Sequence, residues 1–381
     1  MRPGLTTLVT YRPDGTGPQF LSEIAHVSPA VYSFTCPGGC QDLTATVFQP
    51  PRWRTDALDP GRILKAHRGG TIVWAGVLDE PVPAEGGWQL SAHGTGSQGN
   101  DYRAVWTGGW TTSTPDQVVN NAIAAGLPWI NPGIGSPAGM WIGQQVDSGS
   151  ETVSDLLNMI CNKGGLTWSV ATAGGGNVLS VFALPTAVTH LLVAAGPVPR
   201  SVAAGATTLR IRYASAVDSG GNPAVYSLTS VTDTARETAQ GHTEDYLDLS
   251  SAGTYTPSTA QAVGSQVLKR FTRAAFTDAI TLRHGQLLNP GGVPIDPGNF
   301  YADGPVMVAR MHLADLGYSG DIARGPVTFL VGEYDWDDAA CVATVTPFES
   351  MRHRFSDLLS VAAEGHPPQR RKPTSHHKKG R

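Results

Sequence analysis

The clearest pattern of apolar and polar positions in the chain runs from Gly61 to Gly94. It predicts a basic strand over 61–70, a longer strand over Thr71–Val82 and a third strand over Gly87–Gly94. Successive residues of a strand face opposite sides of a sheet, and both sides of the middle strand are apolar, so we expect both to be covered. Gly76, inside that strand, indicates the bend that a barrel wall needs. The stretch predicts the heart of a small antiparallel barrel.

Short strands of the same kind lie before this stretch and return in the last third of the chain. Together with the opening stretch, those before it give about seven strands within some 95 residues, which is typical of a barrel or a sandwich. The earlier ones are predicted at 5–10, 19–27, 31–36 and 43–48. The later ones are predicted at 207–216, 224–232, 279–284, 304–313, 327–335 and 341–346.

A region with helical signals separates the two strand sets. Thr114 and Gln117 form a capping box before a helix that ends at Gly126. Apolar residues at helical spacing, from Val153 to Ile160, predict a second helix, and a glycine-centred hairpin follows it. A further capping box opening at Ser258 predicts one helix inside the second strand set.

The order of these elements predicts a mainly β fold with an α+β insert, in which two barrel-like β domains flank a small α+β domain. We expect the first β-barrel domain over 1–96 and the α+β middle domain over 97–200. The second β-barrel domain, with its one helix, is expected over 201–361. The remaining residues, 362–381, are polar, basic and proline-rich, so we expect a disordered tail.

The composition agrees with a turn-rich β protein. Of the 381 residues, 45 are glycine and 28 proline, and only 15% are charged, against about a quarter in an average protein. The sequence has no apolar stretch of about 18 residues that would predict a membrane span. It also lacks an N-terminal signal segment, and its four cysteines are too few for a disulfide scaffold. Synthesis in a reducing cytoplasm is the expectation.

The net charge of −4 conceals an asymmetry. All 31 acidic residues lie at or before Glu364, whereas six of the 27 basic residues lie beyond it, so the body carries a net charge of −10. We expect the tail to bind an acidic partner surface, with phosphate binding as the alternative. Its basic residues are Arg370, Arg371, Lys372, Lys378, Lys379 and Arg381.

Motifs for metal binding or catalysis are weak. Cys36 and Cys40 frame a single Cys-Pro-Gly-Gly-Cys turn, and zinc sites favour two such pairs. The chain has neither an HExxH nor a GxSxG motif. Gly94–Gly99 spells GxGxxG without a strand–helix context, so we interpret it as a linker. We expect no enzyme activity, no cofactor and no metal.

Two further groups of polar residues receive a structural interpretation. His67 and His93 have no evident carboxylate–serine partners, so we expect surface histidines. Asp335, Asp337 and Asp338 crowd together at a strand end without the loop of a calcium site, so we expect a solvated turn.

Several stretches resemble one protein family. They are Leu58–Leu64 (LDPGRIL), the later VWAGVL and LSAHG, and the helix-to-strand segment Glu151–Val170. These resemble minor tail proteins of actinobacterial siphophages, which are similar to the baseplate hub of contractile tails. The resemblance covers about residues 1–350.

The resemblance implies structural work in a virion. Such hubs carry two related barrels per chain and assemble as trimers, so that six barrels form a ring at the tail tip. The ring closes or lines the tail channel and anchors tip or fibre proteins, next to the distal tail protein and the tape-measure protein. DNA would pass through without specific binding, which a net charge of −10 favours. The alternatives are a hexameric distal tail protein and a tail-associated cell-wall hydrolase.

Aromatic and apolar residues around the first barrel are the expected contacts between chains, because interfaces favour such anchors. The expected interface residues are Trp53, Val73, Trp74, Val77, Trp88, Trp106 and Trp110. One face of the middle strand is expected near a neighbouring chain, either Val73, Ala75 and Val77 or else Ile72, Trp74 and Leu78.

Overall fold

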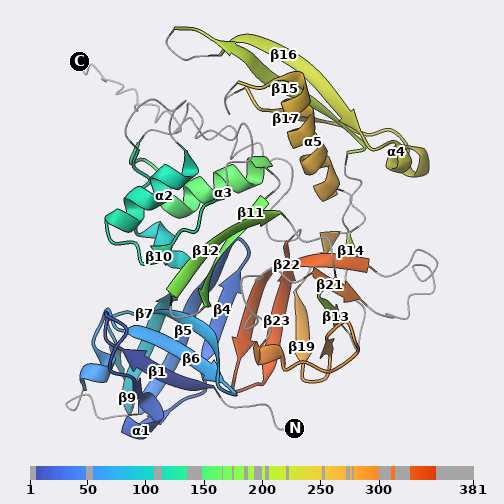
Figure 1. Ribbon diagram of the computed structural model, residues 1–381. Helices are drawn as coiled ribbons and strands as arrows, with labels where there is room; N and C mark the ends of the chain where they lie inside the picture. The colour runs from blue at the N-terminus through green and yellow to red at the C-terminus, as the bar shows by residue number, and fades with distance from the viewer. Residues whose placement is uncertain are drawn as a thin grey trace, which may run out of the picture.

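The structure is a computed structural model with a mainly β fold, as the sequence predicts (Figure 1). Eighteen strands form one connected hydrogen-bonded system, and the other described strands form two small sheets. None of the described helices is long and apolar enough to cross a membrane. The structure describes residues 6–48, 55–106, 114–134, 148–164, 166–173, 176–183, 188–192, 200–201, 206–219, 223–250, 254–271, 275–276, 279–299, 310–313 and 327–348.

The first strand set is antiparallel and occupies the N-terminal quarter of the chain. Its central order is β1–β6–β7–β9–β5–β4, with short strands β2, β3 and β8 at its margins. The strands are β1 (Thr7–Tyr11), β2 (Gln19–Phe20), β3 (His26–Val27), β4 (Val31–Thr35), β5 (Gly38–Phe48), β6 (Ile63–Arg68), β7 (Thr71–Leu78), β8 (Val82–Ala84) and β9 (Gly87–Gly94). The short helices are α1 (Leu21–Ile24), η2 (Asp56–Leu58) and, after β9, η3 (Ser97–Asn100).

Gly76, in the middle of β7, shows why that strand needs a glycine. It pairs with Gly94 of β9. A Cβ at this position would lie 2.3 Å from the carbonyl oxygen of His93 and 2.8 Å from Cα of Gly94. The two strands approach so closely here that no side chain fits between them. Closure of this strand set into a barrel stays a prediction.

The second strand set is joined to the first through one long strand. The C-terminal half of β22 (Val327–Asp337) pairs with β4 on one side and with β23 (Val342–Pro347) on the other. Its N-terminal half pairs with β21 (Arg310–Leu313). The smaller strands of this set are β13 (His190–Leu192), β19 (Ile280–Arg283) and β20 (Leu287–Leu288), with the short helix η4 (Pro297–Asn299) after β20.

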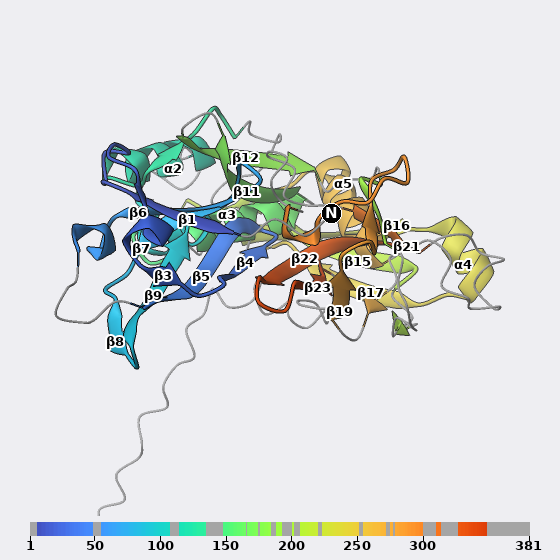
Figure 2. The ribbon, with the colours of Figure 1, turned by 90° about the horizontal axis from the view of Figure 1, so that it is seen from below.

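One hydrophobic core serves both strand sets. Leu64 and Trp74 from the first set belong to the same buried cluster as Leu282, Val331 and Tyr334 from the second. Figure 2 shows β4, β22 and β23 side by side where the two sets meet. The two halves therefore share a sheet and a core, although about 290 residues separate the end of β4 from the start of β22.

The two helices and the hairpin predicted for the middle region are present. Helix α2 (Pro115–Ala124) starts with the expected capping box, in which Oγ1 of Thr114 accepts from the backbone N–H of Gln117 at 3.2 Å. Helix α3 (Val153–Gly164) packs against the hairpin of β11 (Leu166–Ala173) and β12 (Gly176–Ala183), and β10 (Trp129–Ile130) runs parallel to β12. β11 continues into the first strand set by parallel pairing with β5.

The segment after residue 206 differs from the prediction. The hairpin expected in the second barrel, β15 (Thr208–Val217) and β16 (Pro223–Thr232), forms a separate sheet with β17 (Glu244–Asp248). Helix α5 (Pro257–Phe271) covers one face of this sheet, which has its own core. Alternation along a strand shows which side is apolar but not which sheet the strand joins, and that is the reason for the difference.

Smaller elements complete the described chain. They are α4 (Thr234–Gln240) and the two-stranded sheet of β14 (Arg200–Ser201) with β18 (Ala275–Phe276). Helix α5 begins two residues earlier than predicted, because Thr256 and not Ser258 caps it: Oγ1 of Thr256 accepts from the N–H of Thr259 at 3.2 Å, and Pro257 opens the helix. The predicted tail lies outside the described residues.

The close pairing of β7 with β9 at Gly76 provides the first test. Substituting Gly76→Ala forces a methyl group against backbone atoms that cannot move independently, so we expect a loss of about 1–3 kcal/mol in the free energy of unfolding. The control is Gly291→Ala, whose new Cβ meets only the end of the Asn289 side chain at 3.3 Å. Urea unfolding followed by tryptophan fluorescence measures both, and equal midpoints would contradict the close approach.

Candidate functional site at the junction of the strand sets

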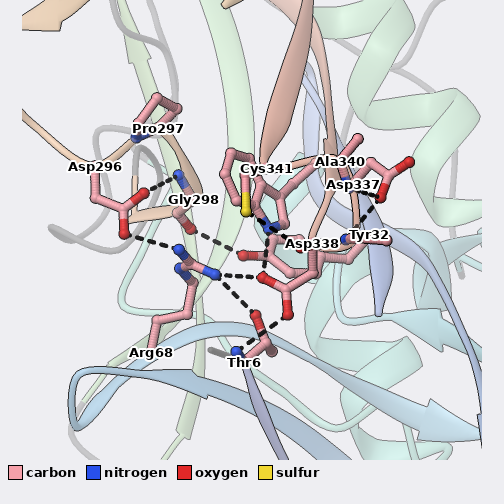
Figure 3. Close-up of polar contacts among 12 residues, drawn as sticks. Thr6, Tyr32, Arg68, Asp296, Pro297, Gly298, Asp337, Asp338, Ala340 and Cys341 are labelled. Atoms are coloured by element: carbon pink, nitrogen blue, oxygen red, sulfur yellow. Dashed lines mark hydrogen bonds and ion pairs between the residues drawn. The ribbon is translucent and has the colours of Figure 1, made fainter. Parts of the chain in front are cut away.

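A buried arginine lies where the two strand sets meet (Figure 3). Arg68 is the last residue of β6, and it follows Leu64 and Ala66 at every second position on the inward side of that strand. Its side chain is 1% exposed. A buried guanidinium is costly unless it is paired and hydrogen-bonded, so its partners decide what this position does.

Arg68 is paired with carboxylates from two distant parts of the chain. Nη1 donates to Oδ1 of Asp338, and Nη2 donates to Oδ2 of Asp296 at 2.8 Å. Nη1 also donates to Oγ1 of Thr6 at 3.2 Å, and the guanidinium lies 4.8 Å from the ring centroid of Trp336. One side chain therefore connects the N-terminal segment, β6, the loop before η4 and the β22–β23 turn.

Asp338 corrects the expectation of a solvated turn. Its side chain is buried, and besides Arg68 it accepts from Nε1 of Trp336 at 3.0 Å and from the backbone N–H of Thr6 at 3.2 Å. Asp337 does what a turn residue does, because its carboxylate accepts from the backbone N–H groups of Ala339 and Ala340. The sequence places three acidic residues together, but only the fold brings Arg68 to Asp338 and so allows that carboxylate to be buried.

The segment around η4 is fitted to the same cluster. A Cβ on Gly298 would lie 2.4 Å from Nε of Arg68, so the arginine requires a glycine there. The hydroxyl of Tyr32 donates to the carbonyl of Gly298 at 2.9 Å, and the hydroxyl of Tyr334 donates to the carbonyl of Pro297. Burial raises the pKa of Tyr32 well above its usual range, so this hydroxyl stays a donor at physiological pH.

The electrostatics of the cluster keep the arginine charged. Burial alone would lower the pKa of Arg68, but its hydrogen bond to Asp296 and the nearby charges raise that pKa above its usual value. Within the cluster the charge of Arg68 is paired with the carboxylates of Asp296 and Asp338. The cluster, which we call the Arg68 clamp (Thr6, Arg68, Asp296, Trp336 and Asp338), fixes the two strand sets to each other.

An acidic group of side chains lies on the face of the shared sheet opposite to the buried Tyr334 and Trp336. Asp335 of β22 pairs in register with Ser33 of β4, and Ser33 in turn lies next to Asp42 of β5, whose carbonyl accepts from the Ser33 hydroxyl. Burial, and then the charges of Glu333 and Asp42, raise the pKa of Asp335 to about 6. Negative charge thus gathers where the two halves join.

His93, Cys36 and Cys40 have defined surroundings in the described part of the chain. Nδ1 of His93 lies 2.7 Å from Oδ1 of Asp79, and its Nε2 lies 3.8 Å from Oδ2 of Asp101, so both ring nitrogens face carboxylates. Cys36 shares a hydrogen bond with Thr167, and burial raises the pKa of Cys40 to about 11. Within the described residues, no group of three His, Cys, Asp or Glu side chains could hold a metal ion.

Most of the expected interface residues that the structure describes are internal to one chain. Val73, Trp74 and Trp88 belong to the shared core. Trp106 is buried with the α+β unit. Val77 is the one member of the described set that keeps partial exposure. Contact of these residues with a second chain stays a prediction, and Trp53, Trp110 and the six basic tail residues lie outside the described residues.

Sequence reasoning did not identify the Arg68 clamp, although one signal was present. Leu64, Ala66 and Arg68 occupy alternate positions of one strand, and such a pattern places the arginine on the inward face. The partners Asp296 and Asp338 carry no comparable signal, because they lie more than 220 residues from Arg68 in the sequence.

Comparison with known proteins gives a consistent result for the fold. No protein-family model and no curated protein sequence matches the chain. Among solved structures, the prophage tail protein gp18 from Listeria monocytogenes EGD-e aligns with a TM-score of 0.56 at 10% identity, covering 94% of this chain and 98% of its own. The 43 kDa tail protein of prophage MuSo2 from Shewanella oneidensis aligns with a TM-score of 0.53 at 14% identity, covering 91% and 98%.

A third structure, the tail protein from Neisseria meningitidis MC58, aligns with a TM-score of 0.53 at 12% identity, covering 90% of this chain and 96% of its own. The chain has the fold of these phage tail proteins. The phage tail fold is matched over at least 90% of the chain in all three comparisons, so it includes most of both strand sets and of the units between them.

The Arg68 clamp provides a stability test. Arg68→Met leaves two carboxylates without their cation at the junction, so we expect a loss of about 3–5 kcal/mol in the free energy of unfolding. Arg210→Met is the control, because its pair with Glu244 is exposed and is worth about 0.2–1 kcal/mol. Chemical denaturation compares the two variants. A clamp variant no less stable than the control would show that the pairing is dispensable.

The raised pKa of Asp335 provides a pH test. Because the pKa of Asp335 is higher in the folded state than in the unfolded state, ionisation of its carboxyl group lowers the free energy of unfolding. This loss is complete above about pH 6 and absent below about pH 4. Asp335→Asn should therefore stabilise the protein at pH 8, by about 1 kcal/mol after allowance for solvent screening. At pH 4 it should have little effect. Thermal melts at both pH values decide this, and equal effects would contradict the assignment.

Proposed function

We propose that this protein is a structural component of a phage tail, acting as a tail-tip hub that assembles as a ring of three chains. The observation that carries the proposal is the end-to-end likeness to three phage tail proteins, each matched over at least 96% of its own length. A chain that follows the fold of tail proteins over at least 90% of its length is suited to the same kind of work.

The junction of the two strand sets supports a role as a tail-tip hub. Two strand sets per chain, held as one body by β4–β22 pairing and the Arg68 clamp, would give six units in a ring of three. Such a ring can match a sixfold tail on one side and a threefold tip on the other. Rigid connection within a chain is what this geometry requires, because each chain must present its two units at a fixed angle.

The negative charge of the chain supports a role in lining a channel through which DNA passes. The body carries a net charge of −10, and the acidic face of Asp42, Glu333 and Asp335 lies on the sheet that both strand sets share. A channel wall of this sign repels phosphates and lets DNA pass without sticking. We propose that the ring contacts the distal tail and tape-measure proteins above and tip or fibre proteins below, with the basic tail binding an acidic neighbour.

The test is the copy number in isolated tails. Native mass spectrometry of the purified chain and quantitative peptide counting of tail particles should both give three copies per complex. A chain that stays single and is missing from tails would sink the proposal. Six copies per tail would favour the distal tail protein instead.

A zymogram addresses the enzymatic alternative. The structural proposal predicts no clearing of peptidoglycan by the purified chain. Clearing that survives further purification would favour the cell-wall hydrolase and contradict a purely structural role.

A further inference from the structure

The sheet of β15, β16 and β17 has one covered face and one open face. Helix α5 packs directly on the covered face, where a Cβ on Gly264 would lie 2.2 Å from Cδ1 of Ile211. On the open face, Arg210 lies in register with Ser230, and Arg212 with Leu228. Figure 1 shows β16 at the outer margin of the molecule, away from the shared sheet.

Large apolar side chains gather on this small sheet. Leu228 is 71% exposed, the highest value among the exposed large apolar residues of the described chain. Tyr226 is 49% exposed and Tyr246 39% exposed, and both lie on the open face with Leu228 by register. Exposed apolar residues that gather on one face, as these do, mark interaction sites in soluble proteins.

The two edges of the sheet are built differently. β17 carries Glu244, Asp245 and Asp248 among its five residues, and charge of this kind protects an edge from pairing with other strands. β16 has ten residues and no charged side chain. Within the described residues, β15 is the one strand that pairs with β16. A long, uncharged edge on the opposite side of the sheet from a charged one is a pairing surface.

The arginines of the open face do not make it a phosphate site. Nε of Arg210 lies 2.9 Å from Oε2 of Glu244, and Nη1 of Arg212 lies 3.4 Å from Oδ2 of Asp248. The guanidinium of Arg212 also lies 4.1 Å from the ring centroid of Tyr226. Each positive charge is matched by a carboxylate within the sheet, so the face is close to neutral and suits an apolar protein surface.

The charge of the chain also bears on which protein docks on this face. Two copies of a body with a net charge of −10 repel each other, so they meet most favourably where the surface carries no net charge. The edge of β16 and the open face beside it are such a place. An acidic patch elsewhere on the body would need a basic partner, whereas this patch needs only a second neutral one.

We propose that the outer edge of β16, together with Tyr226, Leu228 and Tyr246 on the open face, docks on a second copy of this chain. The proposal rests on the ring assembly given above and names a contact surface for it. The neighbouring copy supplies an extended segment to the backbone groups of β16 that face away from β15, and Leu228 is buried at the contact.

The experiment compares three lysine substitutions in the full-length chain. Leu228→Lys removes the apolar anchor, and Ser230→Lys adds the same charge on the same face without removing it. Val293→Lys is the control, because Val293 is a 58% exposed aliphatic residue outside this sheet. Circular dichroism first confirms that all three fold. Mass photometry across a concentration series then gives the oligomer distribution of each.

The expected result is an oligomer for the wild type and for Val293→Lys. For Leu228→Lys and Ser230→Lys we expect a shift to single chains, with the dissociation constant raised at least about tenfold, which is about 1.4 kcal/mol. If both β16 variants keep the wild-type distribution, the β16 contact is overturned while the ring stands. If the wild type is a single chain at every concentration, the ring and the contact both fail.

A final arm tests for another occupant. If the β16 variants still form wild-type oligomers but are missing from assembled tails, the edge belongs to a different tail protein and the second-copy proposal is overturned. Loss of the oligomer in the Val293→Lys control would also count against it, because the effect would then follow added charge and not the β16 surface.

Discussion

The buried pairing of Arg68 with Asp338 and Asp296 is the interaction on which the arrangement of this protein depends. A guanidinium inside the molecule must be compensated there, and its partners come from segments more than 220 residues away. The clamp therefore forms only when the N-terminal strand set, the loop before η4 and the β22–β23 turn are all in place. It specifies one relative position of the two strand sets, which hydrophobic packing alone would leave less defined.

Continuous β pairing gives that position its rigidity. The ladder between β4 and β22 extends the first strand set into the second, and residues from both contribute to one core. Motion between the halves would require breaking this ladder and exposing Tyr334 and Trp336. A chain built this way holds its two strand sets as one body. That property suits a ring whose subunits each span a large arc around a channel.

The sequence predicts local structure well and long-range pairing poorly, for a physical reason. The capping box of Thr114 and Gln117, and the glycine in the middle of β7, are written in a few adjacent residues. The separate sheet of β15–β17 and the pairing of Arg68 are not, because alternation and charge do not specify a distant partner. One feature of the site was predictable from the sequence: the alternating pattern of β6 places Arg68 on the inward face.

The proposed ring of three chains around the tail channel can be seen in intact particles. A low-resolution electron cryomicroscopy map of intact tails carrying an antibody label on this protein tests it most directly. We expect a threefold set of labels at the tail tip, around density with six similar β units. Labels absent from the tail, or six of them above the tip, would contradict it.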